Sequence, residues 1–367
     1  MKVLFVAPYR QNDGWGASSR NWIKAISHNK NIQLAIRPIY YIPNTINIDQ
    51  TILEYENSYY TSYDTVIQKV LPANLHINSS VKNIGILTVE TCDWSNSRNI
   101  LLLNKLDEIY VSTLTEKKHL EQSGIKTKIS IVPEAIDTNI ITNNKESDQL
   151  PIPSNIKRNF IFYCMAGPDP ISNLDKIITA FHLAFDEQDS VSLLIKTDDQ
   201  NNMKHIQELS KKIKETLRIN KVYRNEIIVG RPDNETSIMS IHNTGNCFIN
   251  LKSTDNFCKQ TLIASYLGKT PIVMQNTGLA DVLGKNGGII TKSVKSPLIM
   301  QNPPLMEEYD SYNSREFVYS PIILNLIENM QKIYTLYKAD KKNYNNQMRI
   351  DNLTDYSFES IGAKICN

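Results

Sequence analysis

Residues 252–273 have the sequence KSTDNFCKQTLIASYLGKTPIV. The polar loop at the start leads into a helix of small and apolar residues, and Gly268 stands where that helix should end, because glycine readily adopts the left-handed backbone of a helix C-terminus. Apolar runs at residues 247–250 and 271–274 predict strands before and after it. The stretch is therefore a strand–loop–helix–strand unit, which is typical of a parallel sheet covered by helices.

The same alternation extends over most of the chain. Further strands are predicted at residues 2–6, 32–36, 65–67, 83–89, 108–111, 129–132, 160–164, 192–196 and 226–229. Helices are predicted between them, for example at residues 116–123, 173–185 and 206–213. We therefore predict an α/β fold with two doubly wound halves.

Three stretches depart from this alternation. Residues 138–155 are rich in Asn, Lys, Ser, Asp and Pro and predict a linker between domains. Residues 292–319 break the pattern and predict a long loop over the second domain. Residues 322–365 predict two helices, the second of which begins near Ser357.

The composition excludes several classes of protein. A chain of 367 residues with 41% hydrophobic and 21% charged residues is long enough for two globular domains. Because 40 Lys and Arg face 38 Asp and Glu, the net charge of +2 provides no global field that would attract nucleic acid or an anionic membrane. No apolar run approaches the ~20 residues of a membrane helix, so we expect a cytoplasmic protein with no stable membrane insertion.

The loop at residues 11–19 follows the first predicted strand and contains Gly14, Gly16 and Ala17. Ligands of doubly wound sheets bind beyond the carboxyl ends of the strands, so this loop is a candidate site. Glycines permit positive φ and close approach of a backbone, and the N–H groups of the next helix favour an anion. We expect these residues to shape a ligand site; the alternative is an ordinary turn before a helix.

A second candidate loop begins where the predicted strand at residues 83–89 ends. It contains two carboxylates, Glu90 and Asp93, followed by Trp94. Carboxylates at the end of a strand can accept hydrogen bonds from hydroxyl groups or position a reacting group. The alternative for Asp93 is that it caps a helix.

The loop before the helix that ends at Gly268 is the third candidate. The N-terminus of that helix could hold a pyrophosphate by its N–H groups and its dipole, assisted by Lys259. Lys196 directly follows a predicted buried strand, which would aim its side chain towards the same ligand. We therefore expect Lys196 and Lys259 to contact a diphosphate.

This third segment resembles the donor-site signature of family 4 glycosyltransferases, retaining enzymes of the GT-B fold, whose usual form is E-G-F-G-x-x-x-x-E-A-x-A-x-G-x-P-V. The residues at the E-G-F-G position are Asp255, Asn256, Phe257 and Cys258. Further matches follow in the family's order at residues 1–7 with 14–17, 83–91 with 106–109, 123–126, 131–137 and 356–359. The resemblance therefore covers nearly the whole chain.

The sequence departs from the family pattern at three positions. Ile263 replaces the second Glu, which commonly binds the donor ribose. The Arg that relatives use on the pyrophosphate is absent from residues 167–173; Arg231 could replace it, or it could be a solvated loop residue. Many relatives have a His at the tip of an N-domain strand, and here His76 and Lys69 are the candidates.

The resemblance implies a GT-B architecture of two Rossmann-like domains facing across a cleft. We predict an N-terminal acceptor-side domain at residues 1–145, a nucleotide-sugar donor domain at residues 146–340, and a C-terminal helix segment at residues 341–367 that crosses back to the first domain. The implied reaction is retaining transfer of a sugar, such as a hexose, from a nucleotide diphosphate sugar to an acceptor hydroxyl of a glycan or other molecule.

The resemblance also assigns roles to the residues singled out above. Donor binding falls to Gly14, Gly16, Ala17, Lys196, Arg231, Asp255, Asn256, Phe257, Cys258 and Lys259, and catalysis to Glu90, Asp93 and Lys69. No metal or other cofactor is expected, because lysines and helix N-termini replace a divalent cation at such a site and the only acidic pair after a second-domain strand is Asp198–Asp199. Two alternatives remain: a catalytically silent subunit that binds a protein or glycan, and a sugar transferase that acts on modified DNA.

Overall fold

The computed structural model describes residues 1–366 except 44, 96, 98, 144–148, 154, 155, 157, 198, 218–221, 225, 231–234, 255, 285, 299–316, 342 and 345–347; the side chains of residues 235 and 236 are also not described. The chain divides into two compact units. Among the described residues, the first unit contains residues 1–138, 317 and 353–366, and the second contains residues 139–298 and 318–352. The domain boundary predicted after residue 145 falls outside the described residues, and the C-terminal segment joins the first unit at Leu353 rather than at residue 341.

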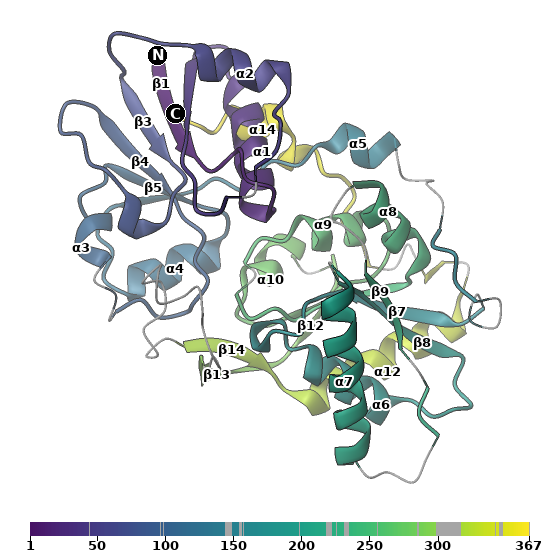
Figure 1. Ribbon diagram of the computed structural model, residues 1–367. Coiled ribbons are helices and arrows are strands. Elements are labelled where there is room, and N and C mark those ends of the chain that lie inside the picture. The colour runs from purple at the N-terminus through teal and green to yellow at the C-terminus, as the bar shows by residue number, and fades with distance from the viewer. Residues whose placement is uncertain are drawn as a thin grey trace. The chain divides into compact units, whose positions relative to one another are not determined.

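The first unit is built on a six-stranded parallel sheet with the order β2-β1-β3-β4-β5-β6 (Figure 1). Its strands are β1 (Lys2–Ala7), β2 (Gln33–Pro38), β3 (Thr65–Gln68), β4 (Lys82–Ile86), β5 (Glu108–Val111) and β6 (Lys128–Ile131). Its helices are α1 (Gly14–His28), α2 (Gln50–Asn57), η1 (Pro72–Asn74), α3 (Ile100–Leu103), α4 (Leu114–Gln122), η3 (Thr354–Tyr356) and α14 (Phe358–Gly362). Strand β4 ends three residues before the predicted Val89, which leaves residues 87–89 in the following loop.

Both faces of this sheet are covered, as the continuous apolar strands predict. Val3 and Phe5 on one face pack with α1 and α14, whereas Val6 on the other face contacts the cluster that includes residues of α3 and α4. Figure 1 shows α1 and α14 on one side of the strands and α3 and α4 on the other. This double coverage is the arrangement expected of a parallel sheet.

The C-terminal helix α14 belongs to the core of the first unit. The side chain of Ile361, within the helix, is completely buried. The side chain of Ile365, three residues beyond the helix end, is completely buried as well. Asn29, at the end of α1, donates its side-chain amide to the carbonyl oxygens of Gly362 (3.1 Å) and Ile365 (3.3 Å). Ser357 caps the helix by accepting a hydrogen bond from the Ser360 amide, as the sequence predicts.

The second unit has another six-stranded parallel sheet, with the order β12-β11-β10-β7-β8-β9. Its strands are β7 (Phe160–Met165), β8 (Val191–Thr197), β9 (Ile227–Gly230), β10 (Cys247–Asn250), β11 (Ile272–Met274) and β12 (Ile289–Thr291). Its helices are α5 (Thr138–Asn143, starting at the division), η2 (Pro170–Ser172), α6 (Leu174–Ala184), α7 (Gln200–Leu217), α8 (Glu235–Thr244), α9 (Lys259–Tyr266), α10 (Gly278–Leu283) and α12 (Ile323–Ala339). This strand order is that of the dinucleotide-binding Rossmann fold, in which the order reverses between β7 and β10.

Alternate residues of β7 point to opposite faces of the second sheet. Phe160 and Phe162 lie in the main core with residues of α6 and α12, whereas Ile161 and Tyr163 lie in a second cluster with residues of α8 and α9. The two faces are thus buried by different pairs of helices.

Two predictions for irregular segments are wrong in part. The predicted linker begins with helix α5, and the predicted loop at residues 292–319 contains β13 (Ser293–Pro297) and the start of β14 (Phe317–Pro321), which form a two-stranded sheet. Both strands are only five residues long and pair only with each other, so neither shows a hydrophobic periodicity long enough to be recognised in the sequence. Among the described helices, none is long and apolar enough to cross a bilayer.

Candidate functional site

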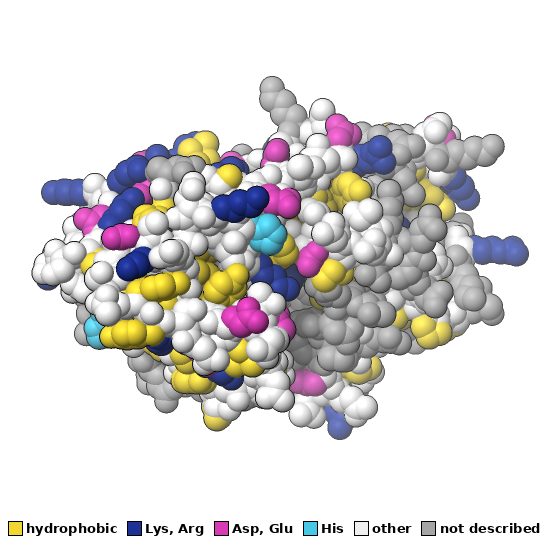
Figure 2. Space-filling view, turned by 90° about the horizontal axis from the view of Figure 1, so that it is seen from above, with side chains coloured by type: hydrophobic (Ala, Val, Ile, Leu, Met, Phe, Trp, Pro, Cys, Tyr) yellow, Lys and Arg dark blue, Asp and Glu magenta, His cyan; other side chains and the backbone are white. Residues whose placement is uncertain are grey.

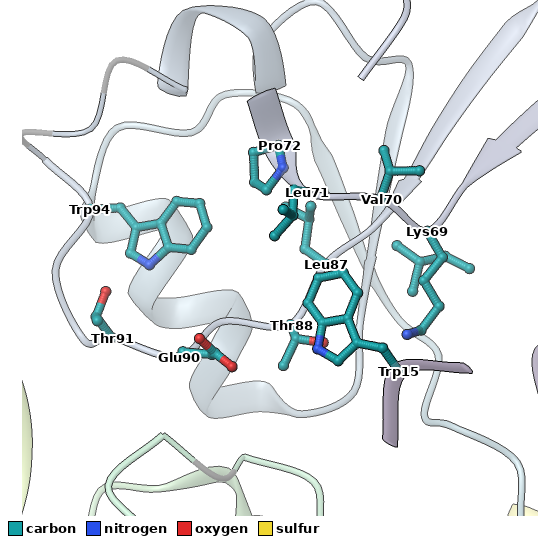
Figure 3. Close-up of a pocket in the computed structure, with 11 residues that line it drawn as sticks. Trp15, Lys69, Val70, Leu71, Pro72, Leu87, Thr88, Glu90, Thr91 and Trp94 are labelled. Carbon is teal, nitrogen blue, oxygen red and sulfur yellow. The ribbon is translucent and has the colours of Figure 1, made fainter. Parts of the chain in front are cut away.

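A small pocket lies at the carboxyl ends of adjacent strands in the first unit (Figure 3). It measures about 40 Å³ as the space open to the centre of a water molecule. Its lining comes from the first turn of α1 and from the loops after β3 and β4, and comprises Trp15, Lys69, Val70, Leu71, Pro72, Ile86, Leu87, Thr88, Glu90, Thr91 and Trp94. Strand order reverses between β1 and β3, so the pocket is where a doubly wound sheet is expected to bind a ligand.

Lys69 and Trp15 form one side of this pocket. The Lys69 ammonium nitrogen lies 5.1 Å from the centre of the Trp15 ring, at cation–π distance. The Lys69 side chain is 6% exposed, and within the described part of the chain it forms no hydrogen bond or ion pair. Burial lowers the pKa of Lys69, and the negative charges of Glu134 and Asp13 oppose this shift. Lys69 is therefore a desolvated cation that borders an open space.

The start of α1 depends on close backbone packing at one glycine. Asp13 caps the helix by accepting a hydrogen bond from the Gly16 amide at 2.7 Å, and Ala17 continues the first turn. A Cβ atom on Gly16 would lie 2.0 Å from the carbonyl oxygen of Gln11, so only glycine fits there. At Gly14 a Cβ atom would meet nothing within 4 Å, and neither glycine has positive φ. Gly16 therefore allows the Gln11 backbone to approach the start of α1 closely, and a ligand site shaped by Gly14, Gly16 and Ala17 stays a prediction.

Glu134 lies beside the same helix. Its carboxylate accepts hydrogen bonds from the Ser18 hydroxyl and, at 3.2 Å, from the Asn21 side-chain amide. The segment at residues 131–137, which resembles the family, therefore places the Glu134 carboxylate close enough to Lys69 to raise the pKa of that lysine.

The other side of the pocket is formed by the loop after β4. Figure 3 shows Trp94 and Trp15 on opposite sides of the pocket, with the Glu90 carboxylate between them in this view. The indole nitrogen of Trp94 is buried and has no hydrogen-bond partner among the described residues. From the sequence, Glu90 is the expected functional residue of this loop, and Trp94 is only its aromatic neighbour.

The buried carboxylate of Glu116 holds this loop in place, which the sequence analysis did not foresee. It accepts hydrogen bonds from the amides of Val89 (3.1 Å), Ser112 (2.8 Å) and Thr113 (3.0 Å), and from the Thr113 hydroxyl at 3.3 Å. Burial raises the pKa of Glu116 to about 7, although these hydrogen bonds act to lower it. The Thr-x-x-Glu spacing of a capping box was the available signal, but it does not reveal the bond to Val89.

Two other candidates of the first unit lie outside the pocket. The Asp93 carboxylate accepts hydrogen bonds from the amide (3.1 Å) and hydroxyl (2.6 Å) of Ser95, and Asp93 caps no described helix. His76 is exposed, whereas Lys69 lines the pocket. Of the three residues predicted to be catalytic, the structure therefore brings Lys69 and Glu90 to one pocket and leaves Asp93 beside it.

In the second unit, the loops after β7 and β10 are joined by hydrogen bonds. The side-chain amide of Asn173 donates to the Leu251 carbonyl oxygen (2.7 Å) and to the Ser253 hydroxyl (2.8 Å), and the Ser253 amide donates to the Ile171 carbonyl oxygen. Asn173 has φ of 51°, a left-handed conformation that Asn adopts more readily than most residues. Because β7 and β10 flank the point where the strand order reverses, these bonds shape the expected ligand crevice of this sheet.

Lys196 lies at the carboxyl end of β8 with a side chain that is 2% exposed. The hydroxyl of its neighbour Thr197 is also buried and has no hydrogen-bond partner within the described residues. Helix α9 begins at Lys259, and its N-cap, Cys258, places no side-chain hydrogen bond on the first turn. Arg231 and Asp255 lie outside the described residues.

The remaining donor-loop candidates are partly buried around the start of α9. The Asn256 side-chain oxygen accepts a hydrogen bond from the Gly278 amide at 2.9 Å, which ties the loop to α10. Phe257, Cys258 and Lys259 are half-buried. Ile263 is 5% exposed and lies within α9, and its side chain offers no hydrogen bond to a ligand.

Metal ligands are not clustered in the described part of the molecule: no group of three or more His, Cys, Asp and Glu side chains there could hold an ion. Metal independence itself stays a prediction.

Comparison with solved structures identifies the fold. The N-terminal domain of Candida albicans trehalose-6-phosphate phosphatase superposes with a TM-score of 0.68 at 11% identity, covering 100% of this chain and 96% of that chain. The HepE protein of Anabaena in complex with UDP and glucose gives a TM-score of 0.61 at 12% identity, covering 100% and 98%. Sucrose-phosphate synthase of Thermosynechococcus elongatus gives 0.60 at 10% identity, covering 100% and 97%.

No protein-family model and no curated protein matches the sequence. The similarity is therefore one of fold, and it extends over the full length of both chains. With two Rossmann-like units and these structural neighbours, the chain has the GT-B fold.

Proposed function

We propose that this protein transfers a sugar from a nucleotide diphosphate sugar to an acceptor hydroxyl. The second unit holds the donor, and the pocket of the first unit holds the acceptor. The observation that carries the proposal is the buried Lys196 at the end of β8, in a sheet with the strand order of nucleotide-binding domains. A structural neighbour of the same fold, HepE, is described in complex with UDP and glucose.

Departure of a nucleoside diphosphate places negative charge on the leaving group, and the enzyme must stabilise it. Lys196 supplies one positive charge, and the amide groups at the start of α9 supply a favourable dipole, with Lys259 beside them. We propose that these groups act without a metal ion. Retention of configuration, a hexose as the transferred sugar and a cytoplasmic location belong to the same proposal.

Nucleotide binding by the Lys196→Ala variant tests the donor site. Loss of a buried charged partner of a phosphate costs about 2–5 kcal/mol, so we expect the dissociation constant for UDP or a related nucleotide to rise about 30-fold or more. Calorimetric titration measures this, and Lys211→Ala is the matched control, because Lys211 is a 78% exposed lysine of the same unit. Equal affinities of wild type and Lys196→Ala would remove Lys196 from the donor site.

A second candidate function is that of a catalytically silent subunit that binds a protein or glycan. It is favoured by Ile263, a buried side chain that stands where the resembled family has a ribose-binding Glu and that offers no hydrogen bond to a nucleotide. Absence of nucleotide binding, together with no release of UDP from UDP-sugars over a panel of acceptors, would support this alternative. Transfer that continues in EDTA would support the metal-free enzyme, and an NMR spectrum of the product would give its anomeric configuration.

The described face seen in Figure 2 offers no special support for a DNA acceptor. Figure 2 shows basic and acidic side chains intermixed over the visible described face, in keeping with the net charge of +2. A DNA-binding face usually gathers Lys and Arg on one side.

A further inference from the structure

The pocket of the first unit is nearly balanced in charge. Among its lining side chains, Lys69 is the one basic group and Glu90 the one acidic group. A phosphate placed in this space would gain an attraction to Lys69 but would also meet the Glu90 carboxylate. Like charges brought together in a partly desolvated site are unfavourable, so this pair of residues disfavours an anionic ligand.

The pocket also offers a neutral hydrogen-bond donor. The buried indole N–H of Trp94 has no acceptor within the described residues. A buried donor left without a partner costs about 1–3 kcal/mol, and a ligand oxygen would remove that cost. The Glu90 carboxylate and the Thr91 hydroxyl add groups that accept hydrogen bonds from hydroxyls. Donor and acceptor groups of this kind match the hydroxyls of a polyol.

The remaining walls are apolar. Val70, Leu71, Pro72 and Leu87 line the pocket, and in Figure 3 Leu71, Pro72 and Leu87 lie between the two indoles. The C–H faces of a sugar ring pack against such surfaces while the hydroxyls at the ring edge reach polar groups. The volume of about 40 Å³ would hold about three water molecules, which is room for one edge of a single ring.

We propose that this pocket binds the hydroxyl-bearing edge of an uncharged sugar and discriminates against the phosphorylated form of that sugar. This inference rests on the proposed function, and it specifies an uncharged sugar as the class of acceptor that the pocket binds. Trp94 donates to one sugar hydroxyl, Glu90 accepts from another, and Trp15, held beside Lys69, forms the opposite wall. Among the structural neighbours, a trehalose-phosphate synthase is described in complex with glucose-6-phosphate. The proposed preference for a sugar without phosphate would therefore distinguish this chain from that protein.

Ligand-observed NMR titration of the full chain with glucose, mannose and galactose, and with their 6-phosphates, tests the proposal. We expect at least one neutral sugar to bind more tightly than its 6-phosphate. Trp94→Phe keeps the aromatic wall and removes the N–H, so it should weaken binding of that sugar about 3- to 10-fold. Glu90→Gln keeps the shape and removes the charge, so it should narrow the difference between the sugar and its phosphate.

Glu121→Gln is the matched control, because Glu121 is a half-exposed carboxylate on α4 of the same unit, and it should leave both affinities unchanged. Tighter binding of every 6-phosphate than of its parent sugar, or binding of no neutral sugar, would overturn the inference. UDP binding measured on the same samples distinguishes failure of the acceptor inference from failure of the proposed transferase. Binding of UDP without binding of any neutral sugar would disprove only the uncharged-sugar acceptor. Sugar binding without any nucleotide binding disproves the transferase instead.

Discussion

Lys69 shows how the burial of a single charged residue opposes stability. Its ammonium group is desolvated, lies 5.1 Å from the centre of the Trp15 ring, and is stabilised by the negative charges of Glu134 and Asp13. Because burial lowers the pKa of Lys69 below its ordinary value of 10.5, the folded chain holds this proton less tightly than the unfolded chain does. The free energy of unfolding contributed by Lys69 therefore increases as the pH rises from the lowered pKa towards 10.5.

We expect Lys69→Met, which has a similar volume and no charge, to keep or raise the free energy of unfolding by about 1 kcal/mol at pH 7. Urea denaturation measures this. Lys126→Met, at an exposed position of the same unit, is the control and should change little. A loss of stability specific to Lys69→Met would show that the cation is structurally required.

At the scale of elements, Glu116 joins helix α4 to the loop after β4. It caps the helix and also binds the amide of Val89, next to Glu90 in the chain. Because its pKa is raised from 4.5 to about 7, the folded state keeps this proton where the unfolded state has lost it. Stability from Glu116 is therefore present below pH 4.5 and is lost as the pH rises through the window to about 7.

Glu116→Gln removes this titration, so the fall in unfolding free energy between pH 5 and 7.5 should shrink by an amount on the order of 1–3 kcal/mol. The variant should also be less stable overall by about 1–3 kcal/mol, since an amide N–H₂ replaces an acceptor among several donors. Denaturant titrations at several pH values give both quantities. The exposed Glu121→Gln serves as control, and an unaltered pH slope in Glu116→Gln would refute the assignment.

Helix α14 illustrates the packing of a short element that is unstable alone. Ala25 of α1 places its carbonyl oxygen 2.3 Å from where a Cβ of Gly362 would be. We expect Gly362→Ala to destabilise the first unit by about 1–3 kcal/mol, because it overpacks this helix contact. Ala363→Ser, one residue later at an exposed position, should have little effect in the same thermal scans. Equal midpoints for both variants would mean that α14 does not hold the first unit together.

At the scale of the whole molecule, the two units have separate hydrophobic cores. Ligands that bind one unit should therefore stabilise that unit first. A nucleotide at 100 times its dissociation constant adds about 2.7 kcal/mol to the unit that binds it.

We expect UDP or a related nucleotide to delay exchange of the β7 and β8 amides, and a neutral sugar to delay exchange of the amides that follow β3 and β4. Hydrogen-exchange mass spectrometry with each ligand separately resolves the two effects. Protection of the first unit by nucleotide alone, with none in the second, would contradict the proposed division of labour.

The sequence alone predicts most strands of the two large sheets and the fold class. Apolar strands alternating with helices predicted two parallel sheets, and the structure has them, because strands buried on both faces must be apolar throughout. The sequence also predicts that Gly268 ends the helix in residues 252–273 with a left-handed backbone, and Gly268 has φ of 73°. These are local features, so neighbouring residues suffice to reveal them.

Only the tertiary structure decided which side chains share a pocket. Lys69, Glu90 and Trp15 were each visible at the end of a strand or the start of a helix, but their meeting depends on the order in which the strands pair. The hydrogen bond from Val89 to Glu116 and the cover that α14 provides for α1 also join residues distant in the chain. Periodicity reports whether a residue is buried, and it carries no information about its partner; that is fixed by the packing of the whole unit.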